Sequence, residues 1–228
     1  GSSCLGPRRC SPMAVVGRGR AGSASACRLQ ETGSLGATPA GAERVLLCVP
    51  DSAIAQVAQN LARGPWVAHV SGATPLAALD PHLSRFSVHP LQTFTRARGP
   101  EQLDGAWAGV TGASDDARAR GHWLASTLGL RSFEIADEWR ILYHAGAAIA
   151  SNYLVTLFRS AERVFNVAGA PPEALLPLMR RTIDNHFELT GPISRGDWST
   201  VDAHLAALRA HTPDLEPLYR VLAEATAR

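Results

Sequence analysis

Three polar side chains, His144, Ser151 and Asn152, interrupt an apolar stretch at residues 139–168 and are candidates for proton chemistry. We expect this stretch to form one long helix, on which Ser151 lies about 20° and Asn152 about 80° around from His144. The three side chains would then line one groove. Imidazole titrates near neutrality, so His144 suits a general acid that protonates a carbonyl oxygen as hydride arrives. Asn152 would hold a substrate hydroxyl or carboxylate, or orient His144.

The competing interpretation of this stretch is a buried helix whose polar groups are satisfied locally. His144 would then bond a backbone carbonyl, and Asn152 would make a hydrogen bond between helices. Ser151 is expected mainly to pack, while also lining the cleft.

Polar or glycine-rich residues follow four predicted strands, at residues 17–22, 50–51, 71–72 and 89–93. In open parallel sheets, ligands bind outside the carboxyl ends of the strands. The four segments together therefore predict a binding site at this edge. Its expected cofactor-binding members around the second segment are Val49, Pro50 and Asp51. Its expected substrate-binding members are Ser71, Gly72, His89 and Gln92.

Each of these residues also has a plainer interpretation. Ser71 and Gly72 would offer a hydroxyl and a backbone N–H to a substrate. Pro90 biases His89 to an extended conformation, which displays the imidazole at the sheet edge; the alternative is a histidine that fixes a loop. Arg195 would pair with a substrate carboxylate through its planar guanidinium, or would be a surface arginine beside Asp197.

The first predicted strand, Met13–Val16, leads into GRGRAG at residues 17–22, which fits the pattern GxGxxG. Gly17 would permit a tight turn, Gly19 would let the backbone approach a pyrophosphate, and Gly22 would let the next helix pack on the strand. The helix N-terminus would supply N–H donors for the phosphates. A disordered Gly/Arg-rich segment would match the pattern by chance. Two arginines flank the loop and would reach phosphate or stay solvated: Arg18 and Arg20.

Strands and helices alternate up to residue 136, which indicates an α/β domain with a mostly parallel sheet. Predicted strands cover residues 13–16, 45–50, 66–70, 86–88, 107–110 and 131–135, with helices at 23–30, 53–63 and 115–128. Asp51 or Ser52 is expected to cap the second of these helices. After residue 136 only helices are predicted, at residues 139–168, 173–189, 197–209 and 214–227. We predict domains at 13–136 and 137–228, and a disordered or cloning-derived extension at 1–12.

Residues 31–44 do not fit an ordinary dinucleotide fold. Such a fold continues with a second strand that ends in an acidic residue, or in an arginine when the cofactor carries a 2′-phosphate. The segment ETGSLGATPAGAER is rich in Gly, Ala, Thr and Pro and has no strand-like run. The second strand is therefore predicted to be shortened or missing.

Composition excludes several functions. All 22 basic residues are arginine, so a Schiff-base lysine and a P-loop lysine are absent. The net charge of +2 gives no case for nucleic acid. Four cysteines lack metal spacing, and no metal site is expected. The most apolar run, residues 141–158, contains polar side chains, so a membrane span is rejected. A cytoplasmic protein is the default expectation.

Several motifs taken together resemble a known family. The order GxGxxG, VLLCVPD, HVSGATPLAAL, SVHPLQTF, YHAGAAIASNYL and LTGPISRGDWSTVDAHL is similar to Rossmann-like proteins that carry a C-terminal "domain of unknown function 2520". These proteins belong to the superfamily of phosphogluconate dehydrogenase-like and ketopantoate reductase-like enzymes. The resemblance runs from about Met13 to the C-terminus. HPLQTF, the H-x6-S-N helix pattern and TGPISRGD are its specific parts.

The resemblance implies an NADP-binding domain, with NAD the less favoured cofactor, and a helical domain that forms a homodimer. It places the active site in a cleft between the two domains. Related reductases use a lysine and an asparagine on the long helix; this chain has no lysine, and His144 with Ser151 and Asn152 occupies the corresponding helix. The implied activity is an oxidoreductase acting on a small 2-oxo or 3-hydroxy acid, with ketopantoate reduction as one candidate.

A second, non-enzymatic hypothesis follows from the shortened segment. A dinucleotide fold without its second strand would persist as a dimeric scaffold or as a sensor of a small anion. Residues 31–44 discriminate between the two hypotheses: a strand beside Met13–Val16 would leave the cofactor site intact, whereas a bare loop would leave the adenosine half without a wall.

Overall fold

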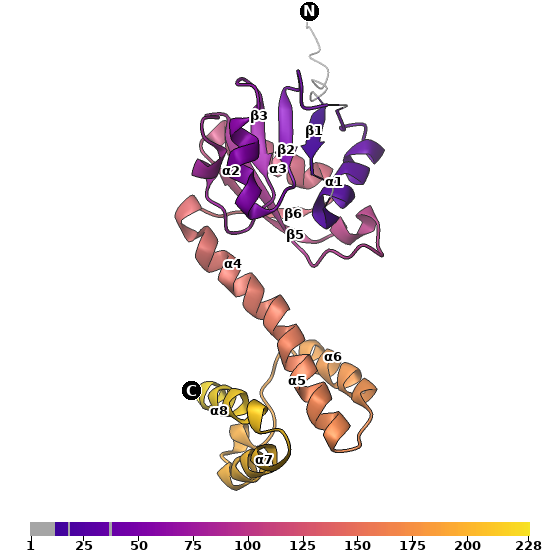
Figure 1. The fold of residues 1–228 in the computed structure, drawn as a ribbon, viewed down its shortest axis with the longest axis vertical. Coiled ribbons are helices and arrows are strands. Elements are labelled where there is room, and N and C mark those ends of the chain that lie inside the picture. The colour runs from indigo at the N-terminus through magenta and orange to yellow at the C-terminus, as the bar shows by residue number, and fades with distance from the viewer. Residues whose placement is uncertain (1–11, 18, 37) are drawn as a thin grey trace, which may run out of the picture. The chain divides into compact units, whose positions relative to one another are not determined.

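The computed structural model describes residues 12–17, 19–36 and 38–228 of the chain, which form two compact units, Gly1–Ala148 and Ile149–Arg228 (Figure 1). Arg18, predicted to flank the phosphate loop, lies outside the described residues, and so do residues 1–11 of the extension predicted at 1–12. The units divide after Ala148, inside the long helix, whereas the sequence places a domain boundary at residue 136.

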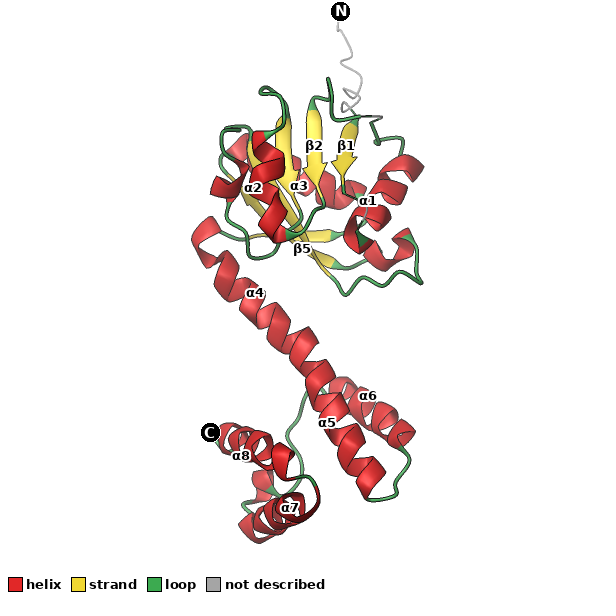
Figure 2. Ribbon diagram, viewed as in Figure 1, coloured by secondary structure: helices red, strands yellow, loops and turns green. Residues whose placement is uncertain are grey.

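The first unit is built on a six-stranded sheet in the order β1-β2-β3-β4-β5-β6 (Figure 2). Its strands are β1 (Met13–Val16), β2 (Arg44–Leu47), β3 (Trp66–His69), β4 (Arg85–Leu91), β5 (Trp107–Gly112) and β6 (Arg131–Glu134). All neighbouring pairs are parallel except β4 and β5, which run antiparallel. The predicted α/β class with a mostly parallel sheet is confirmed.

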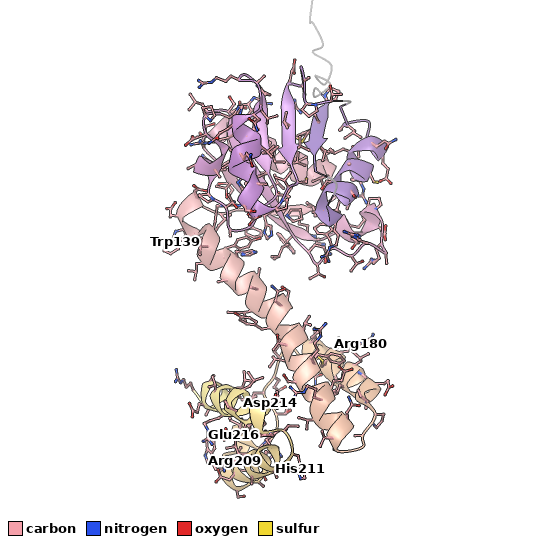
Figure 3. All side chains as sticks on the ribbon, in the orientation of Figure 1. Trp139, Arg180, Arg209, His211, Asp214 and Glu216 are labelled. Carbon is pink, nitrogen blue, oxygen red and sulfur yellow. The ribbon has the colours of Figure 1, made fainter. Side chains whose placement is uncertain are left out.

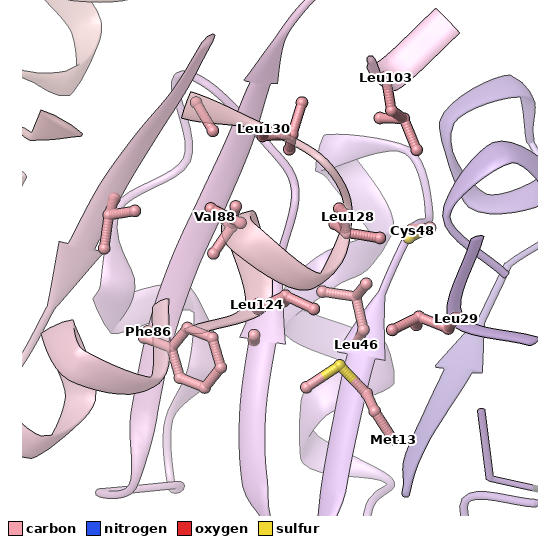
Figure 4. Close-up of a cluster of buried hydrophobic side chains, with 14 of the residues drawn as sticks. Met13, Leu29, Leu46, Cys48, Phe86, Val88, Leu103, Leu124, Leu128 and Leu130 are labelled. Atoms are coloured by element: carbon pink, nitrogen blue, oxygen red, sulfur yellow. The ribbon is translucent and has the colours of Figure 1, made fainter. Parts of the chain in front are cut away.

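Both faces of the sheet are covered, which explains why β2 reads as a continuous apolar run. Leu46 faces a core cluster that also contains Met13, Leu29, Phe86 and Leu124 (Figure 4). Val45 and Leu47, one residue to either side, face a second cluster on the opposite face. This unit also contains the helices α1 (Arg20–Glu31), α2 (Asp51–Gln59) and α3 (Asp115–Thr127), and α4, which is described below.

The second strand of an ordinary dinucleotide fold is reduced to one bridge. Leu35 pairs in parallel with Met13. The N–H of Met13 donates to the Ser34 carbonyl and the N–H of Gly36 donates to the Met13 carbonyl, both at 2.8 Å. No strand follows among the described residues between this bridge and Arg44. The prediction of a shortened or missing strand is therefore confirmed.

The sequence predicts one continuous α-helix at residues 139–168, but the helix in the structure is not uniformly α-helical. It comprises α4 (Arg140–Ala148), a π-helical turn at Ile149–Tyr153 and α5 (Leu154–Val167). A π turn inserts extra backbone into a helix and changes the direction of the side chains that follow. The 20° and 80° expected for Ser151 and Asn152 on an unbroken α-helix are therefore wrong.

The second unit also contains α6 (Leu175–Asp184), α7 (Trp198–His211) and α8 (Glu216–Thr226). The predicted helix at residues 173–189 ends earlier, because His186 and Phe187 adopt positive φ angles of 55° and 59°. An ion pair between Arg209 and Glu216, at 3.1 Å, links α7 to α8 (Figure 3).

One helix among the described residues, Asp137–Val167, is long and apolar enough to cross a membrane. It has 31 residues and a mean hydropathy of 1.3 in its most apolar window, none of which is buried inside the chain. Length and composition alone are weak evidence, and three polar side chains inside the helix argue against a span: His144, Ser151 and Asn152.

Candidate active site

The glycine turn after β1 is fixed by sterics at two of its three glycines. Gly17 has a φ of 108°, and a Cβ there would lie 2.3 Å from the Cys48 carbonyl oxygen. A Cβ on Gly22 would lie 2.6 Å from the Gly17 carbonyl oxygen. At Gly19 the nearest atom is 3.9 Å away, so this position has room for a side chain. The protein itself gives no steric reason for a glycine there.

The N-terminus of α1 is open to an anion. Gly19 is the N-cap and provides no side-chain hydrogen bond, and the first turn contains no acidic residue. The first N–H groups of a helix lack partners within the helix and carry a partial positive charge. The Arg20 guanidinium lies at this end and donates to the Phe94 carbonyl at 3.2 Å, which ties the loop after β4 to the glycine turn.

Ser71 and Asp51 meet where β2 and β3 end. The Ser71 hydroxyl donates to Asp51 Oδ2 at 2.7 Å and accepts the N–H of Thr74 at 3.0 Å. The prediction that Asp51 or Ser52 caps α2 is wrong: Pro50 is the N-cap and no side chain caps this end. Asp51 lies in the first turn of α2, where its negative charge interacts favourably with the helix dipole and its carboxylate accepts the hydrogen bond from Ser71. Val49 packs against the core cluster on the α2 face.

Arg140 is a site residue that is not predicted from the sequence. It is fully buried at the start of α4 and donates to the Thr74 carbonyl at 2.9 Å, to Thr111 Oγ1 at 2.7 Å and to the Ser71 carbonyl. Burial lowers the pKa of Arg140, and the nearby Asp137 carboxylate opposes this change. The only sequence signal was a charged residue opening an apolar helix.

Two imidazoles converge on Gly72. A Cβ on Gly72 would lie 2.6 Å from Cδ2 of His144 and 2.8 Å from Cε1 of His89. The two ring centroids are 5.8 Å apart. His89 Nδ1 lies 2.8 Å from the hydroxyl of Tyr143, a second site residue that is not predicted from the sequence. The predicted members Ser71, Gly72, His89 and His144 therefore lie together at the carboxyl edge of the sheet.

Half-buried His89 and fully buried His69 both have lowered pKa values at this edge. Desolvation, followed by the charges of His144 and Arg140, lowers the pKa of His89 to about 4. Desolvation, followed by Arg140, lowers the pKa of His69 to about 3. His69 is fully buried, accepts the Ser71 N–H on Nδ1, and has no partner for Nε2 among the described residues. The positive charge of buried Arg140 thus lowers the pKa of both imidazoles.

Other predicted site residues are placed elsewhere or used differently. Gln92 donates to the Gln102 carbonyl at 2.9 Å and fixes the loop after β4, so its amide is already engaged. Ser151, Asn152 and Arg195 belong to the second compact unit. The Ser151 hydroxyl lies 3.5 Å from Asn152 Oδ1 on the π-helical turn. The charge of Arg195 acts on Asp197, whose carboxylate caps α7.

A family model described as "Domain of unknown function (DUF2520)" matches residues 106–226, more than half of the chain. The chain belongs to the DUF2520 family. This agrees with the resemblance carried by the HPLQTF and TGPISRGD motifs. No curated protein matches the sequence of this DUF2520 protein.

Solved structures resemble the DUF2520 protein over nearly its whole length. A Bacteroides fragilis protein described as a candidate NADP oxidoreductase is 22% identical, with a TM-score of 0.77, over 95% of this chain and 98% of that one. Protein TM1727 from Thermotoga maritima is 25% identical, with a TM-score of 0.70, over 95% and 100%. A reductive aminase from Aspergillus terreus in complex with NADPH is 14% identical, with a TM-score of 0.68, over 96% and 94%. At sequence identities this low, the similarity shows a shared fold and no more.

Proposed function

We propose that this DUF2520 protein is an NADP(H)-dependent oxidoreductase. The observation that carries the proposal is the glycine turn, where Gly17 and Gly22 are required by the protein's own packing and Gly19 is not. A glycine without a steric role, at an uncapped helix N-terminus, is what close approach of a pyrophosphate requires. The fold shared with a candidate NADP oxidoreductase and an NADPH-binding reductive aminase adds support.

The residues present fit the phosphate half of a dinucleotide. The N–H groups at Gly19 and Arg20 would bind the pyrophosphate, with the Arg20 guanidinium beside it. Pro50 and Asp51, at the end of β2, would border the next part of the cofactor. When bound, the cofactor supplies or accepts a hydride; the protein supplies position, exclusion of water and a proton.

The imidazoles of His89 and His144 beside Gly72 would bind the reacting oxygen of the substrate. His144 would donate the proton to it during reduction, and the Ser71 backbone and His89 would orient it. Asn152, Ser151 and Arg195 belong to the second unit, and their part in substrate binding stays a prediction from the sequence. The substrate class that suits these groups is a small 2-oxo or 3-hydroxy acid, with ketopantoate as one candidate.

A second copy of the chain would cover the apolar surface of the helical unit. A groove of about 660 Å³ lies between α5, α7 and α8, lined by Leu157, Val164, Phe165, Leu208, Leu215 and Leu222 among others. Contiguous exposed apolar surface of this kind marks an interaction site. We expect a homodimer in solution, which light scattering coupled to size exclusion tests directly; a monomer at micromolar concentration would contradict it.

One observation favours a non-enzymatic role. The strand that follows α1 in an ordinary dinucleotide fold is reduced here to a single bridge at Leu35. The adenosine half of a dinucleotide therefore has little protein surface to pack against on that side. Under this alternative the protein binds a smaller anion at the glycine turn and performs no hydride transfer.

Turnover discriminates between the two functions. We expect a panel of 2-oxo acids with NADPH to include a substrate, followed by loss of absorbance at the reduced nicotinamide band. His144→Ala is expected to reduce kcat by about 100-fold or more, as removal of a general acid does. Oxidation of NADPH at equal rates by the variant and the unchanged protein would contradict the role given to His144.

A further inference from the structure

Tyr143 is held by the sheet and directed at His89. Its ring packs against Phe133 of β6, with centroids 5.8 Å apart, and against His89 edge to face at 5.5 Å. Its hydroxyl lies over Gly109 of β5, where a Cβ would be 3.2 Å away. Among the described residues, the one hydrogen-bond partner of this hydroxyl is His89 Nδ1, at 2.8 Å.

The protons of this pair can be assigned. Desolvation raises the pKa of Tyr143 to about 12, so the phenol keeps its proton. The pKa of His89 is lowered to about 4, so the imidazole carries a single proton. If Nδ1 held that proton, it would donate to the phenol oxygen and the phenolic proton would have no acceptor within the described residues. Tyr143 therefore donates to Nδ1, and Nε2 carries the proton of His89.

The protonated nitrogen of His89 faces the site. A Cβ on Gly72 would lie 2.9 Å from Nε2, beside Cδ2 of His144. The charged and titratable groups that act on His89 are His144, Arg140 and Tyr143 from α4, Asp51 from α2 and His69 from β3. Of these, Asp51 alone favours the imidazolium, and its carboxylate is held by Ser71.

We propose that Tyr143 is a positioning residue that fixes His89 in the Nε2–H tautomer, so that His89 presents a neutral hydrogen-bond donor to the substrate oxygen beside Gly72. This inference rests on the proposed oxidoreductase function. A neutral donor that is fixed in place stabilises negative charge developing on an oxygen without first giving up a proton. His89 and His144 then have different tasks: His89 polarises the oxygen, and His144 protonates it.

Imidazole ¹⁵N NMR on the whole protein without cofactor tests the tautomer directly. Long-range ¹H–¹⁵N spectra of ¹⁵N-labelled protein, with His89 assigned by His89→Gln, are expected to show protonated Nε2 and unprotonated Nδ1 from pH 5 to pH 8. Tyr143→Phe keeps the ring and removes the hydroxyl, and is expected to give a mixture of the two tautomers. Tyr219→Phe is the matched control, because Tyr219 pairs with His204 at 2.7 Å in the helical unit; it should leave His89 unchanged.

Two results would overturn the proposal: protonated Nδ1 in the unchanged protein, or an unaltered His89 tautomer in a folded Tyr143→Phe variant. Failure to bind NADPH would instead sink the proposed function and leave the tautomer result standing. Where turnover is found, Tyr143→Phe is expected to lower kcat about tenfold with KM within about twofold, because substrate contacts remain. A change in KM with kcat unchanged would contradict a positioning role.

Discussion

The proposed chemistry depends on Gly72, a residue without a side chain. Gly72 lies between His89 and His144, and neither imidazole could keep its place if residue 72 carried a Cβ. The sequence predicts all three as site residues, because each follows a strand or interrupts an apolar helix. It does not predict Tyr143 and Arg140, because a tyrosine and an arginine in a helix read as packing and surface residues until the fold places them against the sheet.

Gly72→Ala is expected to lower kcat/KM by about 100-fold with little loss of stability. The new methyl group would stand 2.6 Å from the His144 ring and 2.8 Å from the His89 ring, and both rings would have to shift. Displacing catalytic groups by about 1 Å costs rates on this order. Steady-state kinetics and thermal unfolding check the two halves of the prediction. Gly146→Ala is the control, since its Cβ meets no atom within 4 Å; equal rate losses in both variants would contradict the account.

Acid is expected to destabilise the fold through His69. Its folded pKa of about 3 lies below the ordinary value of 6.5, so the unfolded chain binds the extra proton first. The free energy of unfolding is unaffected by His69 above pH 6.5 and decreases as the pH falls from 6.5 toward 3. The loss at pH 5 is about 2 kcal/mol. Urea unfolding at pH 7.5 and pH 5 measures it.

The control for this pH dependence is His69→Asn, which keeps an acceptor for the Ser71 N–H. The variant should lose less stability than the unchanged protein between the two pH values. An identical loss in both proteins would mean that other groups cause the acid sensitivity.

At the scale of elements, the sequence predicts which segments are strands and helices better than how they join. Apolar runs identify β1, β2 and β3, and the absence of such a run in residues 31–44 correctly predicts the missing strand. The π-helical turn at Ile149–Tyr153 is not predictable from periodicity, because its residues suit an α-helix. The antiparallel pairing of β4 and β5 depends on the path of the connecting loop, which Gln92 and Gln102 organise through hydrogen bonds.

Arg140 is expected to anchor α4 to the loop after β3 and to Thr111 of β5. Arg140→Met keeps much of the side-chain volume and leaves the Ser71 and Thr74 carbonyls without their donor. We expect a loss of about 3 kcal/mol in unfolding free energy by urea titration. Arg159→Met, at an exposed arginine, should change stability by less than about 0.5 kcal/mol. A stable Arg140→Met variant would contradict the anchoring role.

At the scale of the whole molecule, the first unit carries the glycine turn and the imidazoles beside Gly72, and the second unit carries an apolar groove. The solved structures from Bacteroides fragilis and Thermotoga maritima share this fold over 95% of the chain. The single bridge at Leu35, in place of a full strand, argues against dinucleotide binding. The glycine turn argues most strongly for it.

The central claim is that the protein binds NADP(H) at the glycine turn. Titration of the purified protein with NADPH and NADH, monitored by energy transfer from tryptophan to the reduced nicotinamide, tests it most directly. We predict saturable binding of NADPH at micromolar concentration, weaker binding of NADH, and loss of both in Gly19→Asp. That variant should fold normally, because no atom lies within 3.9 Å of a Cβ at this position, while its carboxylate would repel a phosphate. No binding of either cofactor up to millimolar concentration would contradict the oxidoreductase and favour the non-enzymatic alternative.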